Sequence, residues 1–136
     1  MKKRNRILLS AIVVLILSSL ACAALSTEPG ASNFYMAKDS EGEIQTSVFS
    51  STDDFYVFFD VSGVEAGANF ESRWYALNIE GQDPNTPFQT IEYAYEEGIS
   101  TVYFQLFTAE GWPAGNYRVE VYLEGAKVGE QSFSVQ

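Results

Sequence analysis

Short apolar segments alternate with turn residues from residue 33 to the C-terminus, with a turn about every eight to twelve positions. The alternation is clearest near the end of the chain, where Tyr117, Val119, Val121 and Leu123 are separated by more polar residues. A period of two is typical of a strand with one buried face. Because no window shows sustained helical periodicity, the sequence predicts an all-β domain.

The segments amount to about seven strands, or eight, in about a hundred residues. Their expected ranges are residues 34–38, 44–49, 55–61, 70–79, 88–95, 99–107, 117–123 and 128–135. The segment GQDPNTP (81–87) is the strongest break between two strands. The segment FYVFFDV (55–61) is apolar on parts of both faces, which predicts a central strand.

The N-terminus has a different pattern, typical of a signal or anchor helix. Four basic residues lie within the first six positions, residues 7–20 are apolar apart from serines, and small residues follow. This is the layout of a secretory signal peptide, which we assign to residues 1–21. The segment LSTEPGAS (25–32) is small and polar, and residues 22–32 are expected to form a tether. The folded domain is expected to span residues 33–136.

Cys22 is a candidate lipidation site. Residues 19–22 (SLAC) resemble a bacterial lipobox, although the leucine stands two positions before the cysteine instead of three. Residues 21–23 (ACA) also fit ordinary cleavage after Ala23, and an apolar run extended to Leu25 is long enough for an uncleaved anchor. Lipidation of Cys22 is favoured over the other two alternatives because the chain's single cysteine falls at the expected cleavage site. The expected location is therefore extracytoplasmic, as a membrane-anchored lipoprotein or as a secreted protein.

Composition excludes several chemistries. The chain has no histidine and one cysteine, so a Ser-His-Asp triad, a Cys-His pair, a histidine-containing zinc site and an intrachain disulfide are impossible. Without the first 21 residues, four basic and 18 acidic residues remain, a net charge of −14. Such a charge strongly disfavours nucleic acid, so no nucleic-acid partner is expected, and it also disfavours docking of the folded domain on anionic lipid. Contact with a membrane is expected only through the N-terminal lipid or anchor.

Three segments resemble the small immunoglobulin-like domains of bacterial secreted proteins and lipoproteins. They are SVFSSTDDFYVFFDV, SRWYAL and WPAGNYRVEVYLEGAKVGEQSFSV. The shared features are an F-S-x-x-D turn before a strand, a tryptophan on a middle strand, and a terminal hairpin that begins W-P-x-G-x-Y. The resemblance covers most of residues 46–135. It implies an immunoglobulin-like or fibronectin type III-like antiparallel β-sandwich and says almost nothing about activity.

The resemblance also implies structural roles for three residues. Trp74 is expected to be the core tryptophan. Tyr117 is expected at a strand entry, with its hydroxyl bonded back to nearby backbone, and Gly115 is expected to allow a close approach before it. The cysteine pair of antibody-type domains is missing, so packing alone must join the two sheets.

Carboxylates are the most abundant candidate catalytic groups. Glycoside hydrolysis requires two of them at a set separation in one cleft. The candidates are Asp53, Asp54, Asp60, Glu92, Glu96 and Glu97. Adjacent acids on a strand point to opposite faces, and no activated nucleophile or base pair is evident. We therefore expect no catalytic residues and no enzyme activity, with a carboxylate-based hydrolase as a minor alternative.

Calcium is the one metal that the sequence suggests. Asp39, Glu41 and Glu43 alternate around Gly42 and offer the oxygen ligands that calcium prefers. The EF-hand spacing is absent, and a solvated acidic turn is the favoured interpretation. No cofactor is expected.

Aromatic residues are candidates for a binding surface. Trp112 lies in a proline-glycine loop, and Tyr93 and Tyr95 are expected on the same face of one strand. Tyr122 is expected on the face of its strand opposite the core residues. Such residues stack on sugar rings or anchor protein partners. The competing and favoured interpretation is that Trp112 caps one end of the sandwich.

The expected function is a non-catalytic binding or assembly module whose partner is a protein or an envelope or extracellular glycan. The alternative is a carbohydrate-binding domain that uses Trp112 and nearby tyrosines. Residues 128–135 could also add a partner strand, although Lys127, Gly129 and Glu130 are typical of a protected edge.

Overall fold

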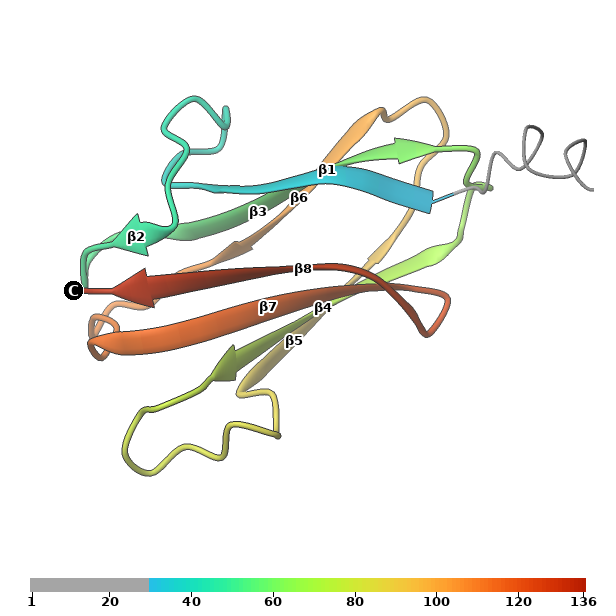
Figure 1. Ribbon diagram of the computed structural model, residues 1–136. Coiled ribbons are helices and arrows are strands. Elements are labelled where there is room, and N and C mark those ends of the chain that lie inside the picture. Colours follow the sequence, from blue (N-terminus) through green and yellow to red (C-terminus); the bar gives the residue numbers. More distant parts are fainter. Residues whose placement is uncertain (1–29) are drawn as a thin grey trace, which may run out of the picture.

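The computed structural model describes residues 30–136, and every regular element in them is a strand (Figure 1). The described residues do not include the predicted signal peptide (1–21) or the first part of the predicted tether (22–29), which contains Cys22. The strands are β1 (Gly30–Ala37), β2 (Val48–Phe49), β3 (Phe55–Ser62), β4 (Asn69–Ala76), β5 (Gln89–Ala94), β6 (Thr101–Leu106), β7 (Gly115–Leu123) and β8 (Ala126–Val135). No helix in residues 30–136 is long and apolar enough to span a membrane.

The strands form two sheets that pack face to face (Figure 1). One sheet has the order β1-β3-β6, and the other has the order β2-β8-β7-β4-β5. All pairs are antiparallel except the short pair of β2 with β8. This arrangement is the predicted immunoglobulin-like β-sandwich, and β3 is a central strand as its apolar pattern predicts.

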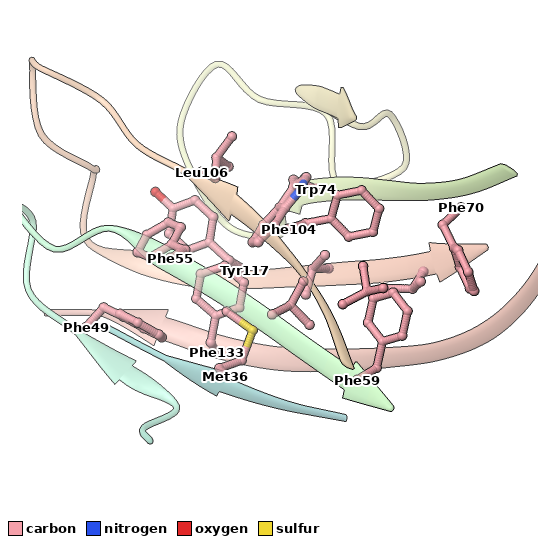
Figure 2. Packing of buried hydrophobic residues seen from close by; sticks show 14 of the residues in the cluster. Met36, Phe49, Phe55, Phe59, Phe70, Trp74, Phe104, Leu106, Tyr117 and Phe133 are labelled. Atoms are coloured by element: carbon pink, nitrogen blue, oxygen red, sulfur yellow. The ribbon is translucent and has the colours of Figure 1, made fainter. Parts of the chain in front are cut away.

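The inner faces of the two sheets meet in an aromatic core (Figure 2). The fully buried side chains include Phe49, Phe55, Phe59, Phe70 and Trp74. The Trp74 Nε1 donates a hydrogen bond to the Ser72 Oγ at 3.0 Å, so its one polar group is satisfied inside the core. These contacts join the sheets in place of the disulfide that antibody domains use.

Several strand boundaries differ from those expected. The segment 44–49 contains only the two-residue strand β2 and one isolated bridge, from Gln45 to Ala37. The strand expected at residues 70–79 ends at Ala76, and β1 begins at Gly30, inside the segment predicted as a tether. These differences arise because the bounds of a strand depend on its pairing partners as well as on its own pattern.

The final hairpin turns more tightly than expected. Only Glu124 and Gly125 lie between β7 and β8, and both have positive φ, 49° and 82°. Two residues with positive φ form the turn whose twist matches that of the flanking strands. Strand β8 therefore begins at Ala126 instead of residue 128.

The two sides of the sandwich differ. On one side β1 lies next to β8: the Phe34 ring lies over Gly129, and the Gln131 Nε2 donates a hydrogen bond to the Phe34 carbonyl at 3.2 Å. A side chain at position 129 would overlap that ring. On the other side the edge strands β5 and β6 belong to different sheets and are not paired with each other.

Candidate functional site

Trp112 lies at the end of the sandwich and connects two loops. Its indole stacks on Phe55, with ring centroids 4.5 Å apart, and its Nε1 donates a hydrogen bond to the Asp53 carbonyl at 3.0 Å. Its backbone N–H donates to the Ser51 carbonyl at 2.8 Å. The loop before β7 is thus fastened to the turn before β3. One face and the only polar group of this indole are already occupied.

Tyr117 and Gly115 lie beside this tryptophan. The Tyr117 hydroxyl donates a hydrogen bond to the Pro113 carbonyl at 2.6 Å, and burial raises the pKa of this phenol. A Cβ at Gly115 would overlap the Ile79 side chain. Trp112, Tyr117 and Ile79 border an apolar pocket of about 130 Å³. This volume is far smaller than that of a typical ligand pocket.

The three candidate tyrosines do not share one surface. Tyr95 is buried beyond the end of β5, and its hydroxyl donates to the Ile99 carbonyl at 2.7 Å. Tyr122 lies on the outer face of the five-stranded sheet, where the Arg73 guanidinium is 3.9 Å from its ring centroid. Tyr93 is half-buried and faces the open side of the sandwich. The structure therefore does not group these tyrosines with Trp112.

The outer face of the five-stranded sheet carries a network of ion pairs. Glu120 is buried at its centre; Arg118 Nε and Lys127 Nζ lie 3.1 and 3.3 Å from one of its oxygens, and the Tyr122 hydroxyl donates to the other. Burial acts to raise the pKa of Glu120, but the bonds from Tyr122 and Lys127 outweigh it and hold the pKa below its usual value. Arg73 pairs with Glu71 in the same sheet.

The acidic segment after β1 is a closed loop. The Asp39 carboxylate accepts the backbone N–H groups of Glu43 and Ile44 at 3.0 and 2.7 Å, and these bonds, led by that of Ile44, lower its pKa. Glu41 accepts a bond from the Ser40 hydroxyl instead. Residues 30–136 contain no group of three acidic, histidine or cysteine residues arranged to hold a metal ion. The structure thus does not bring Asp39, Glu41 and Glu43 together as calcium ligands.

The other candidate carboxylates have separate neighbours. Asp53 pairs with Lys38 at 2.8 Å, Asp54 accepts a bond from Gln105, and Asp60 accepts bonds from Asn33 and Thr101. Asp54 immediately precedes β3 and Asp60 lies six residues further along the extended chain, which corresponds to roughly 20 Å.

The acids on and after β5 do not form a pair in a cleft either. Glu92 is exposed on β5, opposite Glu71, and Glu71 pairs with Arg73. Glu96 and Glu97 are exposed in the turn that follows β5.

A hollow with a volume of about 410 Å³ lies between β5 and β6. Ile91 and Tyr93 border it from β5, and Tyr103 and Phe104 border it from β6. We call it the β5–β6 groove. Tyr103 is 46% exposed, and Phe107, just beyond β6, is 71% exposed. Tyr103 was not among the residues predicted from the sequence to bind a partner, although it lies opposite the apolar face of an expected strand.

The outer face of the three-stranded sheet carries a second aromatic cluster. Tyr35 stacks on Phe58 with centroids 5.0 Å apart, and Phe58 contacts Tyr103 at 5.2 Å. Gly42 packs on Tyr35 and Phe58, so the acidic loop covers this end of the cluster. Tyr103 is the member that stays open to solvent, beside the β5–β6 groove.

Comparison with known proteins identifies the fold. No protein-family model matches the chain, and no curated protein matches it in sequence. Among solved structures, an immunoglobulin-like protein of Pseudomonas aeruginosa is 14% identical over 82% of this chain and 100% of that chain, with a TM-score of 0.60. The PmoD soluble domain of a Methylocystis species is 13% identical over 82% of this chain and 95% of that chain, with a TM-score of 0.50. This chain is thus a small immunoglobulin-like β-sandwich domain, as the sequence resemblance implied.

Proposed function

We propose that this protein is a non-catalytic binding module that acts outside the cytoplasm and is tethered to the membrane by lipid on Cys22. Its binding surface is the open side of the sandwich. The observation that carries the proposal is the β5–β6 groove, because it exposes aromatic and aliphatic side chains in a hollow of about 410 Å³ between two edge strands. Exposed apolar surface of this kind is typical of interaction sites.

The distribution of carboxylates supports the non-catalytic part of the proposal. Each acid at the start and end of β3 is engaged by a different neighbour, and Asp54 and Asp60 lie too far apart for the two-carboxylate mechanism of glycoside hydrolysis. The charge of the mature chain supports a soluble, externally exposed domain.

A carbohydrate-binding function is the alternative, and the described contacts support it less. Trp112 has one face on Phe55 and its N–H on a backbone carbonyl, which leaves a small apolar pocket without a platform for a sugar ring. Tyr93 and Tyr103 in the β5–β6 groove remain available to a glycan.

The tether is tested by expressing the protein with its native leader in a bacterium that processes lipoproteins. The measurements are intact mass and partitioning into detergent, for the wild type, Cys22→Ser and the control Ala24→Ser. We expect the wild type and the control to begin at Cys22, carry acyl mass and enter the detergent phase, and Cys22→Ser to do none of these. Release of all three proteins into the medium would refute the tether, and retention of the full-length chain in all three would indicate an uncleaved anchor instead.

A further inference from the structure

The four edges of the two sheets are not equally protected against pairing with another strand. Edge β1 contains a bulge between Ser32 and Tyr35 and is covered by β8. Edge β8 carries Lys127 and Glu130, and its end pairs with β2. Edge β5 carries Glu92. Charges, bulges and coverage of this kind prevent edge-to-edge association.

Strand β6 lacks all of these protections. Its sequence TVYFQL contains no charge, proline or glycine, and its pairing with β3 shows no irregular register. Val102, Phe104 and Leu106 point into the core, and Thr101, Tyr103 and Gln105 are exposed. It is therefore a regular and uncharged edge of six residues, next to the β5–β6 groove.

The register shows which backbone groups of β6 are free. The Val61 N–H donates to the Ser100 carbonyl at 2.8 Å, and the pairing continues in the same register through β3 and β6. Because hydrogen-bonded and non-hydrogen-bonded pairs alternate in an antiparallel ladder, Val102, Phe104 and Leu106 bond to β3. The N–H and C=O groups of Thr101, Tyr103 and Gln105 therefore point away from β3, toward the open edge.

The charge around this edge is entirely negative. Asp54 bonds to Gln105 near one end of β6, Asp60 bonds to Thr101 at the other, and Glu92 borders the β5–β6 groove. The four basic residues of the described part are engaged elsewhere: Lys38 pairs with Asp53, and the other three lie in the ion-pair network of the other sheet. Charge complementarity thus favours a positively charged occupant. It disfavours a second copy, because residues 30–136 carry four basic and 17 acidic residues.

We propose that β6 binds an extended, lysine- or arginine-containing segment of a partner protein as an added β-strand, with the partner's apolar side chains in the β5–β6 groove. Strand addition draws affinity from backbone bonds and specificity from alternate side chains, which matches a free ladder beside an apolar groove. This inference rests on the proposed binding function and names the partner's chemistry.

The probe is a fluorescein-labelled octapeptide that alternates lysine and valine, and the control peptide has glutamate in place of lysine. Binding is measured by fluorescence anisotropy on the full protein as processed from its native leader, over a range of salt concentrations. We expect the lysine peptide to bind and the glutamate peptide not to bind. Hydrogen exchange should slow at residues 101–107 in the complex, because the free N–H groups become bonded.

Matched variants separate strand addition from simple attraction of opposite charges. Gln105→Pro removes one edge-facing N–H and leaves the bonds to β3 in place, whereas Gln105→Ala removes the side chain and keeps the N–H. Thr101→Pro and Thr101→Ala repeat the comparison at the first residue of the strand, where proline is best tolerated. We expect each proline variant to bind about tenfold more weakly than its alanine partner, while melting temperatures confirm that all four are folded.

Equal binding by the proline and alanine variants, or slowed exchange only at residues outside 101–107, would overturn the inference. So would concentration-dependent dimerisation that Gln105→Pro abolishes, because the occupant would then be a second copy. Displacement of the peptide by chitohexaose with protection at Tyr93 and Tyr103 would assign the groove to a glycan. If the protein is released from the membrane but binds the peptide, the lipid tether on Cys22 is refuted and strand addition at β6 is supported. If the protein is tethered but does not bind the peptide, only strand addition at β6 is refuted.

Discussion

The indole N–H of Trp112 donates a hydrogen bond to the backbone carbonyl of Asp53 at 3.0 Å. Fifty-nine residues separate the two along the chain. The bond, together with the stack on Phe55, holds the loop before β7 against the turn that begins β3. Trp112 is thereby a structural residue at one end of the sandwich, and this role leads to a direct test.

Trp112→Ala is expected to lower the free energy of unfolding by about 2–3 kcal/mol. This loss is no larger than the smallest losses typical of fully buried tryptophans, because the Trp112 side chain is half-buried. Urea denaturation measures the change. Trp112→Phe retains an aromatic stack and loses the bond to Asp53, so it should lose about 1 kcal/mol. An alanine variant that keeps wild-type stability and loses retention on a glycan column would instead support the carbohydrate-binding alternative.

Tyr117→Phe is expected to destabilise the protein by about 1–2 kcal/mol. The substitution removes the hydroxyl that donates to the Pro113 carbonyl and leaves that carbonyl without its partner. Thermal and urea unfolding measure the effect, and Tyr103→Phe serves as the control because the Tyr103 side chain is largely exposed. Equal stability of the wild type and Tyr117→Phe would show that water replaces the hydroxyl at no cost.

The stability of the protein is expected to fall in acid in a way that depends on Asp53. The hydrogen bond from Lys38 and that from the Ser50 N–H hold the pKa of the Asp53 carboxyl below its usual value. A lowered pKa in the folded state stabilises the protein above the unfolded-state pKa of about 4, and this contribution is lost as the pH falls through the folded-state value. Unfolding curves between about pH 6 and about pH 2 measure the loss.

Asp53→Asn and Lys38→Met test the source of this dependence. Near neutral pH both variants should be less stable than the wild type. As the pH falls, the difference in unfolding free energy between each variant and the wild type should shrink, because protonated Asp53 no longer forms the ion pair in the wild type. A difference that stays constant with pH would mean that the Lys38–Asp53 pair contributes only packing.

Gly42→Ala is expected to destabilise the loop over the outer aromatic cluster. Its φ of 70° lies in the left-handed region, and an added Cβ would lie 2.6 Å from the Tyr35 hydroxyl oxygen. Gly98→Ala is the matched control: its φ is 92°, but no atom lies within 4 Å of the added Cβ. Both variants should lose about 1–2 kcal/mol of unfolding free energy because alanine is strained at positive φ. Gly42→Ala should lose more, because its Cβ would also overlap the Tyr35 hydroxyl. Equal losses would show that the loop moves aside freely.

Millimolar calcium is expected to leave the melting temperature unchanged. The Asp39 carboxylate already accepts two backbone N–H groups, and Glu41 and Glu43 do not join it in a ligand set. Differential scanning fluorimetry with calcium and with magnesium as the control checks this. A rise specific to calcium that disappears in Asp39→Asn would identify a calcium site in the acidic loop.

Local pattern predicted most of the fold because strands in a sandwich are half-buried and their side chains alternate. The alternation in residues 117–123 matches β7, and the apolar FYVFFDV segment matches the central strand β3. The pattern was weakest where pairing partners decide the outcome. Val48 and Phe49 form a strand only because the end of β8 lies beside them, and Ile44 stays exposed outside it.

The candidate site was less predictable. Trp112 and Tyr122 had the residue types of a binding surface, yet contacts with Asp53 and Phe55, and with Arg73 and Glu120, engage them in the structure. Tyr103 lies opposite the apolar face of its strand, as Tyr122 does, so the local pattern alone did not single it out as a binding residue. Its exposure depends on which strand becomes the edge of the sheet, and that is a property of the topology.

The sequence by itself determined the β class, the polarity of each strand's two faces, the acidic charge and the absence of histidine chemistry, since all of these depend on local alternation and on composition. Only the tertiary structure decided that β8 is shielded by β1 and β2 while β6 is left open, and that the aromatic residues separate into core, loop and groove. The physical reason is that an edge is defined by the absence of a neighbour. Which backbone groups remain unpaired depends on contacts between segments far apart in the chain.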